Sequence, residues 1–343
     1  MTTTGPHPPT ATLEQVAALA GVSRATVSRV VNDSPRVSPA ARDAVHAAVE
    51  TLRYVPNRMA RSLVTRRTDT IALVLSESNT QIFADPFFAR IVRGLSARLA
   101  DTEQNLVLLA ARGRREQEKV ARYVQQGHVD GVILISLHRD DLLPDLLART
   151  AVPLVLSGRP FDGRPVPYVD ADNVGGAEAA TRLLLRLGRS RIGTVSGPLD
   201  MVAGLDRLAG YRAALAAAGA AERPELVAEG DFTETGGSRA MTRLLGDVPD
   251  LDAVFVASDP MAVGALRVLR AAGRRVPEDV AVVGFDDAEV AATCDPPLTT
   301  VAQPLDEMTG GLVDLLLERI GSGGSPAAGS RVCGTALVRR ASA

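Results

Sequence analysis

Polar side chains that could hydrogen-bond a small polar molecule follow several apolar runs in the second half of the chain. Ser258 and Asp259 come directly after AVFVA, and Asp286 and Asp287 come after VVGF. Arg207 opens the helical pattern that follows GPLD. Open α/β folds bind their ligands at the carboxyl ends of strands, so these side chains are candidates for a binding site. Alternatively, an aspartate at a strand end caps a helix, and an arginine pairs with a neighbouring acid.

A second group of polar residues lies near the N-terminus, within TLEQVAALAGVSRATVSRVVN (12–32). Thr12 and Ser23 are each placed to cap a short helix, and Gly21 permits the left-handed backbone of a tight turn. The exposed face of the second helix would carry Arg24, Ala25, Ser28 and Arg29. Two such helices form a helix-turn-helix, whose second helix enters the DNA major groove, where arginine suits guanine. A plain helical hairpin would explain the apolar positions but not the polar ones.

The elements that would hold these residues divide into helices first and then an alternating pattern. Ser38 and Pro39 begin a third helical pattern that runs to about Leu52 and would close a three-helix core. Strands are expected at 71–75, 106–111, 131–136, 153–157, 191–196, 253–258 and 280–285. Helices are expected at 87–100, 115–126, 173–187, 205–219, 235–245 and 260–272. About 270 residues of this alternation predict two doubly wound lobes of parallel strands with a cleft between them.

Composition excludes several protein classes. Apolar residues make up 46% and charged residues 23% of the chain, which is typical of a globular protein. No apolar run is long enough to span a bilayer, and the N-terminus does not resemble a secretory signal, so a cytoplasmic location is expected. GxGxxG, GxxxxGK[ST] and GxSxG motifs are absent, Cys294 and Cys333 stand apart, and the four histidines are scattered. We therefore expect no cofactor, no metal and no enzymatic activity.

Charge is distributed unevenly along the chain, although the net charge is only −2. Residues 1–67 hold nine Arg and four acidic residues, whereas the remainder holds 29 basic and 36 acidic residues. A basic end on an acidic body is expected where one small part meets a polyanion, although chance clustering would look the same.

The ordered motifs resemble the lactose/purine repressor (LacI/GalR) family of transcriptional regulators. The headpiece motif is followed by VSPAARDAVHAAVETLRYVPNRMARSL, and the likeness continues to the end of the chain. It includes SGPLDMVAGLDRLAGY (196–211), EGDF (229–232), ASDPMAVGAL (257–266), RVPEDVAVVGFDD (275–287) and PLTTVAQP (297–304). The resemblance implies an all-α helix-turn-helix headpiece on a two-lobed, periplasmic-binding-protein-like α/β core. It also implies a homodimer on a pseudo-palindromic double-stranded DNA operator.

The domain boundaries follow from this comparison. Residues 1–10 would be a disordered lead, 11–55 the headpiece, 56–68 a hinge helix or linker, and 69–343 the effector-binding and dimerisation core. The first lobe would comprise about 69–167 and 299–328, and the second about 168–298 and 329–343.

The resemblance also implies which residues meet DNA. Phosphate contacts would come from Thr12, Ser23, Thr26, Ser28, Asn32 and Asn57. Arg24, Ala25 and Arg29 would read bases, with Ala25 offering at most a methyl contact to thymine. The hinge segment 58–65 is too short to be a stable helix in water and would fold on the duplex. There Arg58, Ala60 and Leu63 would lie on DNA, with Leu63 wedged into the central base step. The alternative is a flexible linker with an incidental leucine.

By the same resemblance, an effector lies between the lobes. Arg207 and Asp286 would hydrogen-bond its hydroxyls or ring nitrogens, and Phe232 would stack on it. Further contacts would come from Phe87, Phe88, Ser258 and Gln303, the last at the crossover between lobes. An Arg–Asp pair beside an aromatic face suits a sugar or similar polyol. A purine is disfavoured, because Met201 and Ala203 stand where the purine-binding relative has polar contacts.

We therefore predict a repressor of a carbohydrate-metabolism operon that releases DNA when a sugar-like effector binds. Two alternatives remain. The core could serve only for dimerisation in an effector-independent DNA-binding protein. The chain could also be an α/β enzyme with an added DNA-binding module, although no nucleophile–base pair supports one.

Overall fold

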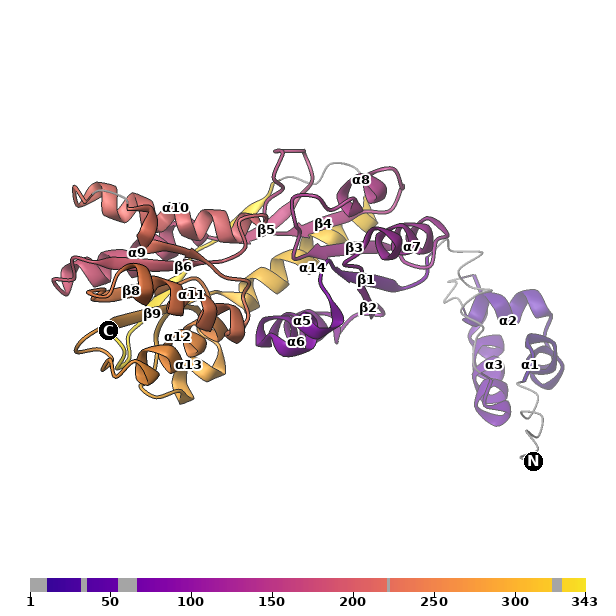
Figure 1. Ribbon diagram of the computed structural model, residues 1–343. Helices are drawn as coiled ribbons and strands as arrows, with labels where there is room; N and C mark the ends of the chain where they lie inside the picture. The colour runs from indigo at the N-terminus through magenta and orange to yellow at the C-terminus, as the bar shows by residue number, and fades with distance from the viewer. Residues whose placement is uncertain (1–10, 32–35, 55–66, 221–222, 323–328) are drawn as a thin grey trace, which may run out of the picture. The chain divides into compact units, whose positions relative to one another are not determined.

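The computed structural model describes residues 11–31, 36–54, 67–220, 223–322 and 329–343 (Figure 1). It divides the chain into two compact units, residues 1–68 and 69–343. The expected disordered lead (1–10) and hinge helix (58–65) lie outside the described residues.

The first unit holds the three expected helices. They are α1 (Leu13–Ala20), α2 (Arg24–Val31) and α3 (Pro39–Leu52). Thr12 begins α1 with a capping box, since its Oγ1 accepts from the Gln15 amide (3.3 Å) and its own amide donates to Oε1 of Gln15 (2.8 Å). Gly21 ends the helix with φ +64°, the left-handed conformation expected there.

One small apolar core joins the three helices. Val16 of α1, Val27 and Val30 of α2, and Val45 of α3 are buried together. Tyr54, directly after α3, is also buried in this core, although the sequence patterns did not indicate it.

The first lobe of the second unit is built on an all-parallel sheet with the order β11-β5-β4-β3-β1-β2. Its strands are β1 (Thr70–Leu75), β2 (Asn105–Ala110), β3 (Gly131–Ile135), β4 (Leu154–Ser157), β5 (Tyr168–Ala171) and β11 (Arg331–Cys333). Its helices are α5 (Asn79–Ala84), α6 (Pro86–Leu99), α7 (Arg114–Gln125), α8 (Leu143–Ala148) and α14 (Leu305–Gly321). Ile71, Leu73 and Leu75 pack against α6 and α14 on one face, while Ala72 and Val74 face the cluster with α7 and α8. Burial on both faces explains why this strand is a continuous apolar run.

The second lobe repeats the arrangement, with the order β12-β10-β9-β8-β6-β7 and only β12 antiparallel. Its strands are β6 (Ile192–Ser196), β7 (Val227–Glu229), β8 (Ala253–Val256), β9 (Ala281–Asp286), β10 (Thr299–Ala302) and β12 (Ala336–Val338). Helices α9 (Asn173–Arg186) and α10 (Val202–Ala217) cover one face (Figure 1). The other face is covered by α11 (Glu234–Asp247), α12 (Asp259–Ala271) and α13 (Glu289–Thr293), and a short 3-10 helix, Pro224–Leu226, precedes β7.

The predicted lobe boundaries are wrong by one strand at each of the three crossings. Strand β5 belongs to the first sheet and β10 to the second, the reverse of the prediction, and β11 also belongs to the first sheet. The chain therefore crosses after each of these strands rather than before it. YVDA, TTVA and RVC are too short and too polar to read as strands, so only their hydrogen-bonded partners reveal where they belong.

The patterns also missed α14, which packs on the first lobe against α6 and strands β3, β4 and β5. By contrast, all seven expected strands and six expected helices are present, with their ends shifted by a few residues. The two-lobed doubly wound fold is thus confirmed.

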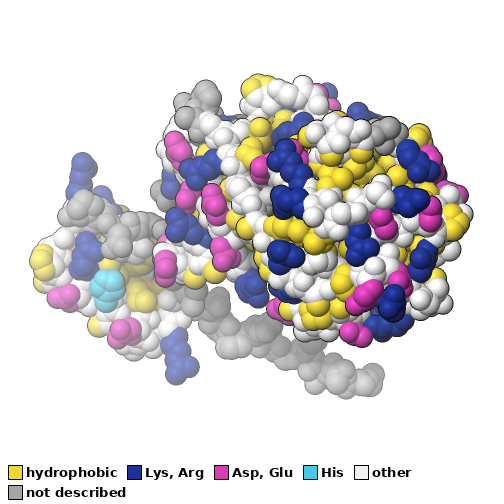
Figure 2. Space-filling view, turned by 90° about the vertical axis from the view of Figure 1, so that its left-hand side faces the viewer, with side chains coloured by type: hydrophobic (Ala, Val, Ile, Leu, Met, Phe, Trp, Pro, Cys, Tyr) yellow, Lys and Arg dark blue, Asp and Glu magenta, His cyan; other side chains and the backbone are white. Residues whose placement is uncertain are grey.

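Both sheets have their first strand flanked by the second and third, β2-β1-β3 and β7-β6-β8. The chain reverses its winding direction at these points, and loops there diverge to leave a crevice at the carboxyl ends of the strands. On the core face shown in Figure 2, basic and acidic side chains are interspersed rather than separated by sign.

Candidate functional site

The outer face of α2 presents the predicted DNA-reading side chains to solvent. Arg24, Ala25 and Arg29 are exposed. Of the predicted phosphate contacts, Thr12 and Ser23 are exposed, and Thr26 and Ser28 are half-buried. Ser23 Oγ accepts from the Thr26 amide (3.1 Å) and lies 2.9 Å from Thr26 Oγ1, so both hydroxyls are fixed at the start of the helix. A helix N-terminus with fixed hydroxyls and exposed arginines is suited to an anionic duplex.

Arg24 already has a partner within this unit. Its Nε lies 3.2 Å from Oε1 of Glu14 on α1, and both side chains are largely exposed. An exposed pair of this kind is weak, so a guanine edge or phosphate could displace Glu14 at small cost. Five predicted DNA contacts lie outside the described residues and remain predictions: Asn32, Asn57, Arg58, Ala60 and Leu63.

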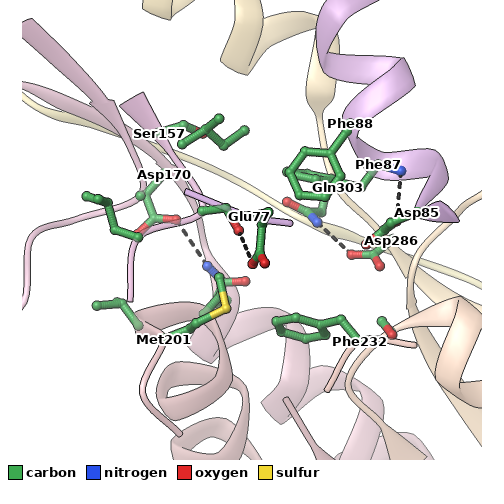
Figure 3. Close-up of a pocket in the computed structure, with 18 of the residues that line it drawn as sticks. Glu77, Asp85, Phe87, Phe88, Ser157, Asp170, Met201, Phe232, Asp286 and Gln303 are labelled. Atoms are coloured by element: carbon green, nitrogen blue, oxygen red, sulfur yellow. Dashed lines mark hydrogen bonds between the residues drawn. The ribbon is translucent and has the colours of Figure 1, made fainter. Parts of the chain in front are cut away.

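The crevice between the two lobes contains a cavity of about 880 Å³, counting space open to solvent (Figure 3). All seven residues predicted to bind an effector line it: Phe87, Phe88, Arg207, Phe232, Ser258, Asp286 and Gln303. They come from α6, α10, the loops after β7 and β8, the last residue of β9, and the crossing after β10. The fold thus assembles in one place residues spread over more than two hundred positions of sequence.

Arg207 is the central cation of the cavity. Its side chain is buried, with Nε donating to Asn173 Oδ1 (2.9 Å) and Nη1 to the Ala257 carbonyl (2.6 Å). Nη1 also lies 3.3 Å from Asp286 Oδ1, and the guanidinium packs 3.8 Å from the centre of the Phe285 ring. Burial lowers the pKa of Arg207, while Asp286 opposes that effect. These contacts fix the plane of the guanidinium before any ligand arrives.

Asp286 faces Arg207 from the end of β9. Its Oδ1 accepts from Gln303 Nε2 (2.6 Å), and burial raises the pKa of its carboxyl, with Arg207 acting against the rise. Its carbonyl accepts from Arg90 Nη1 of the first lobe (2.9 Å). Asp286 therefore lines the cavity and also accepts a hydrogen bond from the opposite lobe.

Asp85 approaches Asp286 from the first lobe. Its Oδ1 accepts from the Phe87 amide (2.9 Å) and so caps α6. Burial, followed by the negative charge of Asp286, raises the pKa of Asp85 to about 7. Near neutral pH this carboxyl can therefore either donate or accept a hydrogen bond.

Aromatic rings supply the apolar surface of the cavity. Phe232 enters from the second lobe, with its ring centre 5.6 Å from the Arg207 guanidinium. Phe88 enters from α6 of the first lobe, in edge contact with Phe87 (Figure 3). Rings entering from both lobes can cover the apolar faces of a ligand while polar groups meet its edges.

Three of the six described non-glycine residues with positive φ angles line the cavity. Ser136, Phe232 and Asp286 have φ angles of +61°, +62° and +112°. Such conformations cost energy in non-glycine residues and persist where surrounding structure enforces them, most often at ligand sites.

Two of the four strand-end candidates have structural roles instead. Asp259 is buried and accepts from Thr300 Oγ1 (2.6 Å) and the Ala288 amide (2.7 Å), which fixes the loop after β9. Asp287 pairs with Arg340 (2.7 Å) and does not line the cavity. Neither aspartate caps a helix, so the capping alternative does not describe them, whereas Ser258 both caps α12 and lines the cavity.

Several polar residues also line the cavity that the sequence patterns did not indicate. They are Glu77, Gln81, Asp85, Ser136, Ser157, Arg159, Asp170 and Asn173. Ser136 directly follows β3, and Glu77 is the second residue after β1, so the strand-end rule used for the second lobe would have found them in the first. Arg159 is paired with Asp206 across the lobes, with Nε 3.1 Å from Oδ2, and no sequence pattern indicates that pairing.

Two further findings concern the described residues alone. They contain no group of three or more His, Cys, Asp or Glu side chains placed to hold a metal ion. Nor does any of their helices have the length and hydropathy needed to cross a membrane.

Comparison with known proteins gives consistent matches over nearly the whole chain. Residues 12–57 match the model of bacterial regulatory proteins of the lacI family, and 181–343 match a periplasmic binding protein-like domain. The HTH-type transcriptional regulator CelR of Thermobifida fusca is 55% identical over 312 residues, covering 90% of this chain and 92% of that protein.

Solved structures show the same relationship. A transcriptional regulator CelR–cellobiose complex superposes with a TM-score of 0.78 at 51% identity, covering 97% of this chain and all of that one (100%). The lac repressor dimer bound to operator and the anti-inducer ONPF gives a TM-score of 0.85 at 29% identity, covering 97% and 99% of the two chains. The predicted family and fold are thereby confirmed, and these relatives are regulators rather than enzymes. The chain belongs to the lacI family of bacterial transcriptional regulators.

Proposed function

We propose that this protein is a cytoplasmic repressor that binds a pseudo-palindromic operator as a homodimer and is released from it by cellobiose or a closely related disaccharide. The observation that carries the effector assignment is the cavity. It sets a buried Arg207–Asp286 pair beside Phe232. The chain is 55% identical to the CelR of Thermobifida fusca and 51% identical to a CelR that was solved as a complex with cellobiose.

The chemistry of the cavity suits a neutral sugar. A pyranose ring has apolar C–H faces that pack on aromatic rings, and hydroxyls at its edge that both donate and accept hydrogen bonds. Arg207 supplies donors, Asp286 and Asp85 supply acceptors, and Phe232 and Phe88 supply apolar surface. The seven predicted site residues are the ones we propose to contact the sugar.

Regulation follows from the two-lobed design. A ligand changes DNA affinity only as far as it binds one lobe arrangement better than the other. Arg90 and Arg159 already join the lobes around the cavity, so a bound sugar adds to contacts that set their arrangement. We infer that this change reaches DNA through the segment joining the two units.

The test begins with selection of an operator from random duplex DNA by the purified protein, followed by fluorescence anisotropy with and without sugar. We expect cellobiose to weaken operator binding at least tenfold and to raise the melting temperature, since a ligand that binds the folded state stabilises it. Maltose, with the same two glucose units in an α linkage, is the matched control and should do neither.

If no sugar changes the melting temperature or DNA affinity, the core serves only for dimerisation, and the effector-independent alternative is correct. Breakdown of bound cellobiose would instead support the enzyme alternative.

A further inference from the structure

One histidine connects a carboxylate of the cavity to the opposite lobe. His138 lies in the loop after β3 of the first lobe, with only 9% of its side chain exposed. Its Nε2 is 3.0 Å from Oε1 of Glu77, and its Nδ1 is 2.7 Å from Oδ2 of Asp200, in the second-lobe loop before α10. The two loops also pair through their backbones, since the Arg139 amide donates to the Asp200 carbonyl (2.7 Å).

Both ring nitrogens of His138 therefore face carboxylates, which accept hydrogen bonds but do not donate them when ionised. A neutral imidazole carries one N–H and can donate to only one of them. Both contacts form together only when the ring is protonated. The geometry thus specifies an imidazolium between two carboxylates that belong to different lobes.

Of the three hydrogen-bonded residues Glu77, His138 and Asp200, Glu77 is the one that lines the cavity. Its carboxylate lies in the cavity wall (Figure 3). Oε1 accepts from Ser136 Oγ (2.9 Å) as well as from His138, whereas within the described part of the chain Oε2 accepts no hydrogen bond. Oε2 is thus an acceptor held in place for a ligand hydroxyl.

We propose that His138 is a positioning residue that holds Glu77 toward the effector and ties it to the second lobe through Asp200. The cleft then binds its sugar tightly, and transmits that binding to DNA, only while the imidazole is protonated. This inference rests on the proposed sugar effector and adds a site residue and a pH dependence to it.

The surroundings of the ring support this assignment. Burial alone would lower the pKa of His138, but the hydrogen bonds that the ring donates to Glu77 and Asp200 outweigh it and raise the pKa. Two charged residues follow in the same loop: Arg139, whose guanidinium packs over the Phe161 ring, and Asp141. Asp141 accepts from the His138 amide (2.7 Å), so it fixes the loop rather than the ring.

The experiment measures cellobiose affinity by calorimetry between about pH 6 and pH 9 for the full-length protein, His138→Gln and His128→Gln. The wild type should lose roughly tenfold in affinity as pH rises through the raised pKa of His138, because the neutral ring can then donate to only one of the two carboxylates. His138→Gln should bind weakly throughout and lack this component. Asp85 titrates in the same range in all three proteins, so only the difference between them is assigned to His138.

His128 is the matched control, since it stacks on Tyr123 and does not line the cavity. His128→Gln should reproduce the wild-type curve. An equal affinity and pH profile in His138→Gln would overturn the inference and leave the proposed function intact.

A readout without ligand separates the two proposals further. A histidine whose pKa is raised by folding contributes stability that is present below its unfolded pKa and lost as pH rises through its folded pKa. The melting temperature of the wild type should therefore exceed that of His138→Gln near pH 6, and this difference should vanish near pH 9. If that pattern holds but cellobiose does not bind, the histidine bridge stands and the proposed effector is wrong. If the melting-temperature difference does not vary with pH, the bridge itself is wrong.

The second-lobe end of the bridge has its own variant. Asp200→Ala removes a side chain that is half exposed, so the fold should tolerate it. We expect cellobiose to reduce operator binding several-fold less in this variant than in the wild type. An undiminished effect on DNA would show that Asp200 does not carry the coupling.

Discussion

The charged side chains of the cleft owe their properties to burial. Arg207 and Asp286 are almost inaccessible to solvent, and an isolated buried charge is costly. The opposite charges of Arg207 and Asp286 offset the free-energy cost of burying each other. Asn173 and Gln303 supply further hydrogen-bond partners to the two side chains. The site therefore depends on geometry as well as on charge.

Replacement of Arg207 by lysine tests that geometry. Arg207→Lys keeps the charge but cannot reach Asn173, the Ala257 carbonyl and Asp286 at once, because an ammonium lacks the planar fork of a guanidinium. We expect cellobiose affinity to fall roughly tenfold to a hundredfold, about 1.4–2.8 kcal/mol, in titration calorimetry. Arg212→Lys, on the exposed side of the same helix, is the control and should bind normally. Equal affinities for the two variants would argue against a site at Arg207.

Asp85→Asn tests the carboxylate that faces Asp286. Asparagine can still cap α6, but it removes a charge whose pKa is about 7 in the folded protein and 3.8 ordinarily. Because the folded state holds the proton more tightly, wild-type stability falls as pH rises from about 4 to 7. We expect Asp85→Asn to be more stable than the wild type by roughly 1–2 kcal/mol above pH 7, a figure reduced because solvent reaches part of the carboxyl.

The measurement is urea unfolding of both proteins at several pH values. The advantage of Asp85→Asn should shrink steadily below about pH 7 and be nearly gone at pH 4. A difference in the free energy of unfolding that stays constant across this range would show that folding does not raise the pKa of Asp85.

One of the predicted DNA-reading residues of helix α2, Arg24, is already paired with Glu14 of α1. Arg24 must leave Glu14 before it can contact DNA. Glu14→Gln removes the competing carboxylate, so operator affinity should rise about two- to fivefold, more at low salt, since an exposed pair contributes no more than about 1 kcal/mol. Glu50→Gln, an equal charge change on the exposed face of α3, is the control. If both variants bind DNA equally well, net charge and not release of Arg24 explains the gain.

The segment that joins the two units lies outside the described residues, and its role stays a prediction. If residues 58–65 fold as a helix on DNA, Leu63→Ala removes an apolar wedge that kinks the duplex. The extra protein–DNA contacts of the bent duplex offset the cost of that kink. Operator affinity should fall about tenfold and DNA bending, measured by gel mobility of permuted fragments, should decrease. Cellobiose affinity should not change. Unaltered operator binding would favour the flexible linker with an incidental leucine.

Acidic side chains outnumber basic ones among the residues that line the cleft. Glu77, Asp85, Asp170 and Asp286 line it against two arginines, and both arginines are paired with aspartates. No unpaired cation among the described lining residues is available for a ligand anion, and a second negative charge in this low-dielectric space is unfavourable. A sugar hydroxyl, by contrast, can donate to these carboxylates.

Cellobionic acid, which differs from cellobiose by a carboxylate at the reducing end, tests this electrostatic selectivity. We expect it to bind at least tenfold more weakly than cellobiose at neutral pH, with part of the difference recovered as pH falls below about 7 and Asp85 becomes protonated. Comparable calorimetric affinities for the two sugars at neutral pH would contradict it.

Much of the molecule was readable from its pattern of residues, because local rules decide local structure. Capping residues, Gly21 and the spacing of apolar side chains were enough to identify the three headpiece helices. Continuous apolar runs identified the central strands, which are buried on both faces. The seven cavity residues were found through resemblance to a family combined with the rule for strand ends, not by pattern alone.

What only the folded chain decided were relationships between distant segments. The lobe to which β5, β10 and β11 belong depends on hydrogen bonds to strands far away in sequence. The pairing of Arg159 with Asp206 and the bridge from Glu77 through His138 to Asp200 each join the two lobes. Such contacts leave no periodic trace in a sequence, because each needs only one residue at each end and a fold that brings the ends together.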